Sequence, residues 1–208
     1  MKRGRFITFE GIEGVGKTTN IEHMRTMLEA QEIVVHVSRE PGGTPLAEQI
    51  RDVLKAHTDE IMPAIAESLL MFASRSVHVR NKVEPALNAG EWVICDRFTD
   101  TSRAYQGAGR GLPESTIETL ADWVHGDVNP DLTVLLDAPA DIGMERAGRR
   151  GKLDRIESEA LDFFERARQF YLDLAAQEPH RFIVIDATQS IEAVQQDIEA
   201  LTHRLLSD

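Results

Sequence analysis

The residues best suited to chemistry lie in a glycine-rich segment near the start of the chain. Residues 11–18 read GIEGVGKT and fit the pattern G-x-x-x-x-G-K-[ST]. Such glycines let backbone N–H groups turn toward phosphate oxygens, and the helix that follows adds partial positive charge. Lys17 would reach the terminal phosphates, and Thr18 would offer its hydroxyl to Mg²⁺. The segment predicts a nucleoside triphosphate site made of Gly11, Ile12, Glu13, Gly14, Val15, Gly16, Lys17 and Thr18.

A second pair of reactive side chains, Asp96 and Arg97, directly follows the apolar run Trp92–Cys95. Asp96 could hold Mg²⁺ through water, and the planar guanidinium of Arg97 could bind a phosphate with two hydrogen bonds. The alternative is a structural pair that only closes the loop. We favour binding, because loops after strands lie at the ligand edge of an open α/β sheet.

A third feature is a basic cluster at 146–155, which stands out in an acidic chain. Its members are Arg146, Arg149, Arg150, Lys152 and Arg155. Neighbouring cations repel one another, so the cluster makes sense if a polyphosphate completes it and if its charge stabilises phosphoryl transfer. The alternative is helix-end charge that complements the helix dipole.

The elements that would position these residues follow from the hydrophobic pattern. Short, largely apolar runs rich in β-branched residues are typical of strands buried on both faces of a parallel sheet. They occur at Phe6–Phe9, Ile33–Val37, Trp92–Cys95, Leu132–Leu136 and Phe182–Ile185. The stretches between them are long enough for crossover helices, so the pattern predicts an α/β fold.

Three helices are indicated by capping and periodicity. One starts at Thr18, and another starts at Pro63, carries apolar residues at i+4 spacing and ends or bends at Pro85. The last is capped by Ser190. The apolar positions are Ile65, Leu69, Ala73 and Val77 in the second helix, and Ile191, Val194, Ile198, Leu201 and Leu205 in the last.

Composition limits the remaining classes of protein. The chain has 208 residues with 23 Lys and Arg against 35 Asp and Glu, a formal charge of −12 that is unsuited to duplex nucleic acid. Its longest apolar run, Leu69–Ala73, is far shorter than the roughly 20 residues of a membrane span. We expect one domain over residues 1–208, no membrane or nucleic-acid partner, and a cytoplasmic location.

A GTPase switch is disfavoured by missing motifs. No Asp is followed by Gly at the third position, as D-x-x-G requires, and Asn81-Lys82-Val83-Glu84 only approaches the N-K-x-D pattern. That near match lies within a helical pattern, where we interpret it as a solvated helix face. The phosphate-binding segment alone does not distinguish a kinase from a P-loop ATPase.

Taken together, the motifs resemble those of bacterial thymidylate kinases, P-loop enzymes that phosphorylate thymidine monophosphate (dTMP) with ATP. The likeness covers nearly the whole chain. Its segments are Glu13 in the phosphate loop, Arg39-Glu40-Pro41-Gly42-Gly43-Thr44, Asp96-Arg97 through Ala104-Tyr105-Gln106-Gly107, Asn129-Pro130-Asp131-Leu132 and Leu153-Asp154-Arg155.

The resemblance implies a P-loop fold of three layers, with a five-stranded parallel sheet between helices, matching the five apolar runs. It implies a mobile lid at about 146–155 over ATP and a homodimer built from helices. Because the phosphate loop has no arginine, the chain is similar to members whose catalytic arginine comes from the lid. We expect Arg150 in that role, with Arg149 as the second choice and as an ATP contact.

The same resemblance implies roles in the acceptor site. Glu13 would lie near the acceptor sugar or its phosphate-binding arginine, and Tyr105 beside the sugar. Arg39, Arg51 and Arg97 would surround the acceptor phosphate, and Ser102, Arg75 and Gln106 would meet the base edge. Phe72 is expected to stack on the base; it lies three residues before Arg75, while Met71 lies four before, where relatives carry the ring. Ordinary helix core is the alternative for Phe72.

The sequence thus predicts transfer of the γ-phosphoryl of MgATP to dTMP, with Lys17, Arg97, Arg150 and Glu13 as catalytic residues and Thr18 and Asp96 near the metal. Two alternatives remain. One is a kinase for another nucleotide or nucleoside, and the other is a P-loop ATPase that acts as a switch or binding protein.

Overall fold

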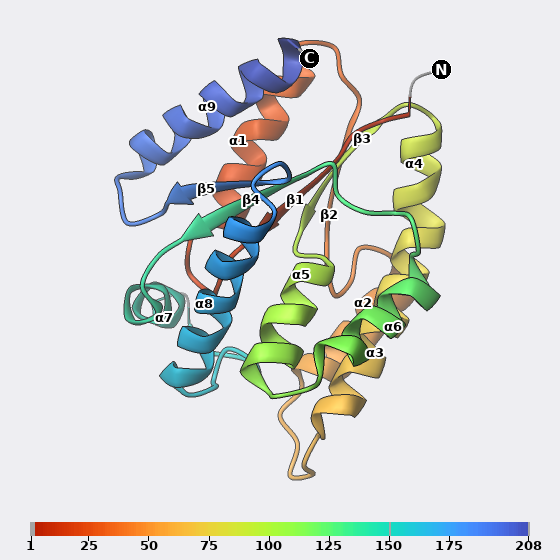
Figure 1. Ribbon diagram of the computed structural model, residues 1–208, viewed down its shortest axis with the longest axis vertical. Helices are drawn as coiled ribbons and strands as arrows, with labels where there is room; N and C mark the ends of the chain where they lie inside the picture. Colours follow the sequence, from red (N-terminus) through yellow and green to blue (C-terminus); the bar gives the residue numbers. More distant parts are fainter. Residues whose placement is uncertain (1–2, 150, 208) are drawn as a thin grey trace.

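The computed structural model describes residues 3–149 and 151–207, and its centre is a parallel sheet (Figure 1). The strands are β1 (Phe6–Glu10), β2 (Val35–Arg39), β3 (Trp92–Asp96), β4 (Leu132–Asp137) and β5 (Phe182–Asp186). Within the described residues they form one five-stranded sheet in the order β2-β3-β1-β4-β5, with every neighbouring pair parallel. The predicted α/β fold with five parallel strands is confirmed.

The second strand lies two residues later than the apolar pattern indicates. The N–H of Ile33 donates to the carbonyl of Leu28 at 3.3 Å, so Ile33 belongs to the turn that ends the preceding helix. Pairing with β3 instead continues through Ser38 to Arg39, which is opposite Asp96. The ladder needs only backbone groups, so it extends past the apolar run into polar residues that face the site.

Helices cover both faces of the sheet. The α-helices are α1 (Lys17–Glu29), α2 (Pro45–Lys55), α3 (Ala64–His78), α4 (Glu84–Asn88), α5 (Thr99–Ser102), α6 (Glu114–Val124), α7 (Ala140–Gly148), α8 (Leu161–Gln177) and α9 (Ile191–Ser207). Two π-helical segments, Val79–Val83 and Arg103–Gly109, continue α3 and α5. Helices α1 and α9 pack together, and α8 lies across the sheet from them (Figure 1). Right-handed crossovers between parallel strands produce this distribution.

The two longest predicted helices form, but they use their apolar residues differently. In α9 the Ser190 hydroxyl accepts a hydrogen bond from the N–H of Ala193 at 3.2 Å, and Val194 and Ile198 are buried as expected. In α3 the i+4 stripe faces outward: Ile65 is 43% exposed and Leu69 is 52% exposed.

The buried face of α3 is instead rich in polar side chains that point toward the carboxyl edge of the sheet. It carries Glu67, Ser68, Met71, Phe72, Ser74, Arg75 and His78. Pro85 lies in the first turn of α4, directly after the π-helical segment Val79–Val83, so the hydrogen-bonding pattern of the long helix changes next to this proline. In the part of the chain that the structure describes, no helix combines the length and apolar character needed to cross a membrane.

Candidate active site

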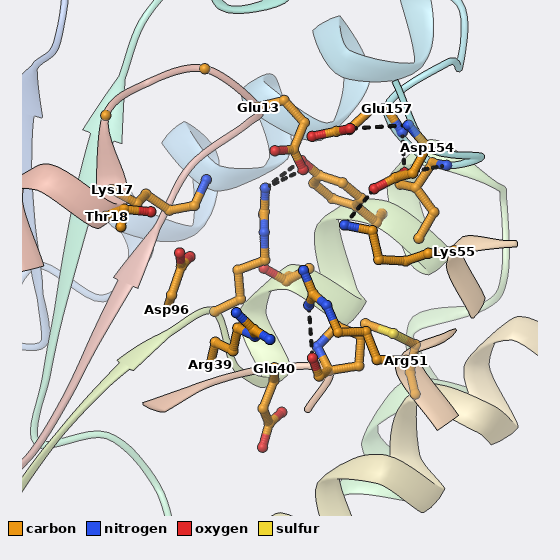
Figure 2. Close-up of a pocket in the computed structure, with 18 of the residues that line it drawn as sticks. Glu13, Lys17, Thr18, Arg39, Glu40, Arg51, Lys55, Asp96, Asp154 and Glu157 are labelled. Carbon is orange, nitrogen blue, oxygen red and sulfur yellow. Dashed lines mark hydrogen bonds and ion pairs between the residues drawn. The ribbon is translucent and has the colours of Figure 1, made fainter. Parts of the chain in front are cut away.

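A cavity of about 630 Å³ opens at the carboxyl ends of β1, β2 and β3 (Figure 2). Lys17 and Thr18 lie on one side of it, and Arg51 and Lys55 lie on the opposite side (Figure 2). Eleven of the predicted site residues line it: Glu13, Gly14, Gly16, Lys17, Thr18, Arg39, Arg51, Asp96, Arg97, Tyr105 and Gln106. Lys55, Met71, Arg146, Asp154, Ile156 and Glu157 also contribute to the wall. Residues predicted from four separate segments therefore share one space.

The phosphate loop joins β1 to α1 and depends on backbone that only glycine adopts readily. Gly14 has φ 74° and lies so close to α7 that a Cβ would be 2.0 Å from the carbonyl oxygen of Gly143. In the other direction, a Cβ on Gly143 would lie 2.5 Å from the carbonyl oxygen of Glu13. The loop and α7 thus meet backbone to backbone, which fixes the loop's shape before any ligand binds.

Lys17 is held by the loop itself. Its ammonium donates to the carbonyl oxygens of Gly11 at 3.0 Å and Ile12 at 2.8 Å. Burial, followed by the positive charge of Arg97, lowers the pKa of Lys17 to about 8. A phosphate that replaced the carbonyls would restore a full negative partner for this buried cation.

Asp96 and Thr18 supply oxygens for a metal ion. Oδ1 of Asp96 is buried and has no hydrogen-bond partner, and the side chains of both residues line the cavity. A hydroxyl and a carboxylate oxygen without a donor are suitable ligands for Mg²⁺, which takes its other ligands from phosphates and water. The residues present therefore fit this ion.

Arg97 adopts a left-handed backbone, with φ 73°, that is uncommon for a bulky residue. Its guanidinium donates to the Gly11 carbonyl at 3.0 Å, to Glu13 Oε1 at 2.6 Å and to the Tyr105 hydroxyl at 3.1 Å. These contacts fix the side chain over the loop. Because Lys17 donates to the same Gly11 carbonyl, the two cations are brought to one point.

Glu10, which the sequence reasoning missed, supports this arrangement from below. It accepts hydrogen bonds from the Phe98 N–H at 2.7 Å, the Thr101 hydroxyl at 2.6 Å and the Tyr171 hydroxyl at 2.8 Å. Burial, followed by the negative charge of Asp100, raises the pKa of Glu10 to about 7. In the sequence, Glu10 stands out only as a charged residue that directly follows the apolar run Phe6–Phe9.

Two further arginines lie on the acceptor side. Nη2 of Arg39 is 2.9 Å from Oε2 of Glu48, and Nη1 of Arg51 donates to the Pro41 carbonyl at 2.8 Å. Both side chains border the same cavity as Arg97 (Figure 2). The structure thus brings the three predicted acceptor arginines together.

Arg75 and Ser102 are brought together as well, but beneath the cavity wall. Arg75 is 1% exposed and donates to Glu40 Oε2 at 2.6 Å, to Ser102 Oγ at 3.1 Å and to the Phe98 carbonyl at 3.0 Å. Neither Arg75 nor Ser102 is among the described residues that line the cavity. Contact of either with a base stays a prediction.

Phe72 and Met71 lie on different sides of the same wall. Phe72 packs with Ile117 and Leu120 in a small apolar cluster, and its ring is 4.5 Å from the guanidinium carbon of Arg75. Met71 lines the cavity. The thioether therefore presents the apolar surface nearest the acceptor space, and stacking by Phe72 stays a prediction.

The segment after α7 forms part of the cavity wall. Asp154 pairs with Lys55 at 2.7 Å, and Arg155 donates to the Leu54 carbonyl at 2.9 Å, so the segment is attached to the end of α2. Arg146 borders the cavity and donates to the Ala187 carbonyl at 2.8 Å. Nη2 of Arg149 is 2.5 Å from Oε1 of Glu145, and the Arg149 side chain is 74% exposed. Arg149 is not among the described residues that line the cavity. Arg150 lies outside the described residues, so its predicted role and the mobility of the lid are untested.

Comparison with known proteins identifies the family. A model of the family described as thymidylate kinase matches residues 9–198. The chain belongs to the thymidylate kinase family. The family resemblance seen in the motifs is confirmed.

Relatives within the family are similar along almost their full length. Thymidylate kinase of Alcanivorax borkumensis is 52% identical over 97% of both chains, and that of Pseudomonas fluorescens is 50% identical over 98% of this chain and 97% of the other. The crystal structure of thymidylate kinase from Ehrlichia chaffeensis aligns with a TM-score of 0.77 at 33% identity, over 96% of this chain and 98% of the other. The likeness therefore extends over nearly the whole chain and is not limited to the phosphate loop.

Proposed function

We propose that the protein transfers the γ-phosphoryl group of MgATP to the 5′-phosphate of dTMP, giving dTDP and ADP. Family membership supports the reaction. The observation that carries the assignment in this chain is the shared Gly11 carbonyl, which brings Lys17 of the phosphate loop and Arg97 of the acceptor side to one point. Cations at that point are suited to hold two anionic phosphates in line and to screen their repulsion.

The residues' tasks are positioning and electrostatic stabilisation. The acceptor phosphate is already an anionic nucleophile near neutral pH, so the transfer requires no base to activate it. Lys17 would bind the terminal phosphates of ATP, while Arg97, Arg39 and Arg51 would hold the acceptor phosphate. Glu13, which is 2.6 Å from Arg97, orients that guanidinium. The lid arginines, Arg150 with Arg149 second, are proposed to stabilise the charge of the transferred group.

Mg²⁺ is part of the proposal, with Thr18 and Asp96 as the residues that would hold it. When bound, it neutralises charge on the phosphate oxygens of ATP. The protein's contribution is the buried, unpartnered Oδ1 of Asp96 at the end of β3.

The test is ADP release with MgATP and each deoxy- and ribonucleoside monophosphate in turn. Turnover should require an acceptor and be fastest with dTMP. Arg97→Ala should lower kcat/KM by at least two orders of magnitude, because it removes the buried cation that would hold the acceptor phosphate next to the ATP site. Arg80→Ala is the matched control, because Arg80 is a surface arginine, 83% exposed, that pairs with Glu84.

The outcomes separate the alternatives. Preference for another monophosphate would keep a kinase and reject dTMP as its substrate. ATP hydrolysis that needs no acceptor would place the protein with P-loop switches. Near-normal activity of Arg97→Ala would refute the acceptor-site assignment.

We also propose a homodimer formed by the outward face of α3 and the neighbouring α6. Leu69 is 52% exposed on α3 and Trp123 is 79% exposed on α6, and the two helices pack against each other. Large apolar side chains on adjacent helices are suited to cover the same face of a second copy.

A cytoplasmic location is proposed on the sequence alone.

A further inference from the structure

Glu67 on α3 is a fully buried carboxylate that joins α3 to two other segments of the chain. Its exposure is 0%. Oε1 accepts from Nε2 of Gln106 at 2.8 Å and from Nε of Arg110 at 2.6 Å. Oε2 accepts from Nη2 of Arg155 at 2.6 Å. The π-helical segment with its C-terminal Arg110, and the base of the lid, therefore converge on one side chain of α3.

The carboxylate determines how the Gln106 amide is turned. An ionised carboxylate can only accept hydrogen bonds, so the NH₂ group of Gln106 must face Glu67 and the amide oxygen must face away. That oxygen, Oε1, is buried and has no hydrogen-bond partner, and Gln106 lines the cavity at the carboxyl ends of β1, β2 and β3. A buried acceptor without a partner is unfavourable unless a ligand donates to it.

Glu67 keeps its charge despite its burial. Burial alone acts to raise the pKa of Glu67, but hydrogen bonds from Arg110 and Gln106 outweigh it and hold that pKa below the usual value. The side chain is therefore an acceptor at neutral pH and cannot donate to the Gln106 oxygen.

We propose that Glu67 is a positioning residue for base recognition: it fixes the Gln106 amide so that the acceptor site offers an oxygen to a ring N–H. The inference rests on the proposed function. Thymine and uracil carry such an N–H at ring position 3, whereas cytosine carries an acceptor at that position. An amide oxygen that is fixed in the site thus favours thymine and uracil. An amide that could rotate would accommodate cytosine as well.

The test compares dTMP with deoxycytidine monophosphate in Glu67→Met, which keeps the side-chain length and removes the acceptor. We expect the ratio of the two kcat/KM values to fall about tenfold or more, because Gln106 can then turn its NH₂ group into the cavity. A merely structural role for Glu67 would lower both values together and leave the ratio unchanged. That result, in a folded variant, would overturn the proposal.

Arg110→Met is the matched control. It removes the other donor to the same carboxylate oxygen and leaves Gln106 attached to Glu67. It should retain the wild-type ratio even if the protein is less stable. If Arg110→Met lost the preference for dTMP as fully as Glu67→Met does, the effect would come from the stability of the whole cluster. That result would overturn the proposal.

A second measurement uses the wild-type protein and needs no stable variant at Glu67. The side-chain N–H protons of Gln106, assigned by NMR, should exchange slowly with solvent because Glu67 accepts from them. Rapid exchange would overturn the proposal. If wild-type protein instead shows slow exchange but no turnover with dTMP, the positioning stands and the proposed substrate fails.

Discussion

The charge state of a single residue, Glu10, couples the stability of the fold to pH. The pKa of Glu10 rises from the ordinary 4.5 to about 7 in the folded chain, so the folded state binds more protons than the unfolded state between these values. Stability contributed by this group is therefore lost as pH rises from about 4.5 to 7, by on the order of 3 kcal/mol. The difference in unfolding free energy between wild type and Glu10→Gln should decrease by this amount over that range.

The comparison with Glu10→Gln is needed because His125 has the opposite effect. Burial, followed by the positive charge of Arg75, lowers the pKa of His125 from 6.5 to about 4. The stability that His125 contributes is lost as pH falls from about 6.5 to 4. In wild type, the effects of Glu10 and His125 on the free energy of unfolding therefore change with pH in opposite directions. Urea denaturation at a series of pH values gives the difference directly. A difference that is independent of pH would show that Glu10 titrates normally.

Residues in local motifs could be predicted, whereas residues whose partners are distant in sequence could not. Lys17 and Thr18 follow from a pattern of eight positions, and Asp96 and Arg97 from their place after a strand. Glu67 looks like a solvated position on a helix, and nothing nearby in sequence indicates Gln106 and Arg155 as its partners. Their meeting depends on how α3 packs, which a local pattern does not specify.

Among the secondary-structure elements, the contact between the phosphate loop and α7 should be sensitive to a single methyl group. Gly143→Ala places a Cβ 2.5 Å from the Glu13 carbonyl oxygen, so either the loop or the helix must move. We expect a loss of about 1 to 3 kcal/mol in stability and a raised KM for ATP. Thermal unfolding and steady-state kinetics measure both.

Gly148, in the same helix, provides the control. A Cβ at Gly148 has no atom within 4 Å, so Gly148→Ala should leave KM unchanged and gain up to about 1 kcal/mol from helix propensity. A normal KM for ATP in Gly143→Ala would show that the close contact does not shape the loop.

The predicted elements were accurate where burial decided their pattern. All five apolar runs led to strands, the second of them shifted by two residues. The central strands β1, β3 and β4 are buried along most of their length, whereas Val37 in β2 and Val184 in β5 are partly exposed at the edges of the sheet. The inward face of α3 could not be read from periodicity, because polar side chains such as Glu67 and Arg75 are buried against groups from distant segments while the apolar stripe points outward. Hydrophobic pattern indicates the buried face only where the core is apolar.

For the whole molecule, the apolar stripe on α3 predicts association of two copies. Leu69→Lys should convert a dimer into a monomer with little effect on the fold, because Leu69 is already 52% exposed. Sedimentation velocity measures the change. Ile191→Lys should leave the dimer intact, because Ile191 is a similarly exposed residue, at 50%, on α9, which packs against α1 and β5. A monomeric wild type, or a dimeric Leu69→Lys variant, would refute this interface.

The hydrogen bond between Tyr171 and Glu10 has a consequence for synthesis of the chain. The two residues are 161 positions apart, yet the tyrosine belongs to the network under Arg97. A growing chain emerges from the ribosome N-terminal end first, so the complete phosphate loop is outside long before α8 has been made. Until then the loop lacks the support that orients its cations. The order of translation thus delays a finished nucleotide site until most of the enzyme exists.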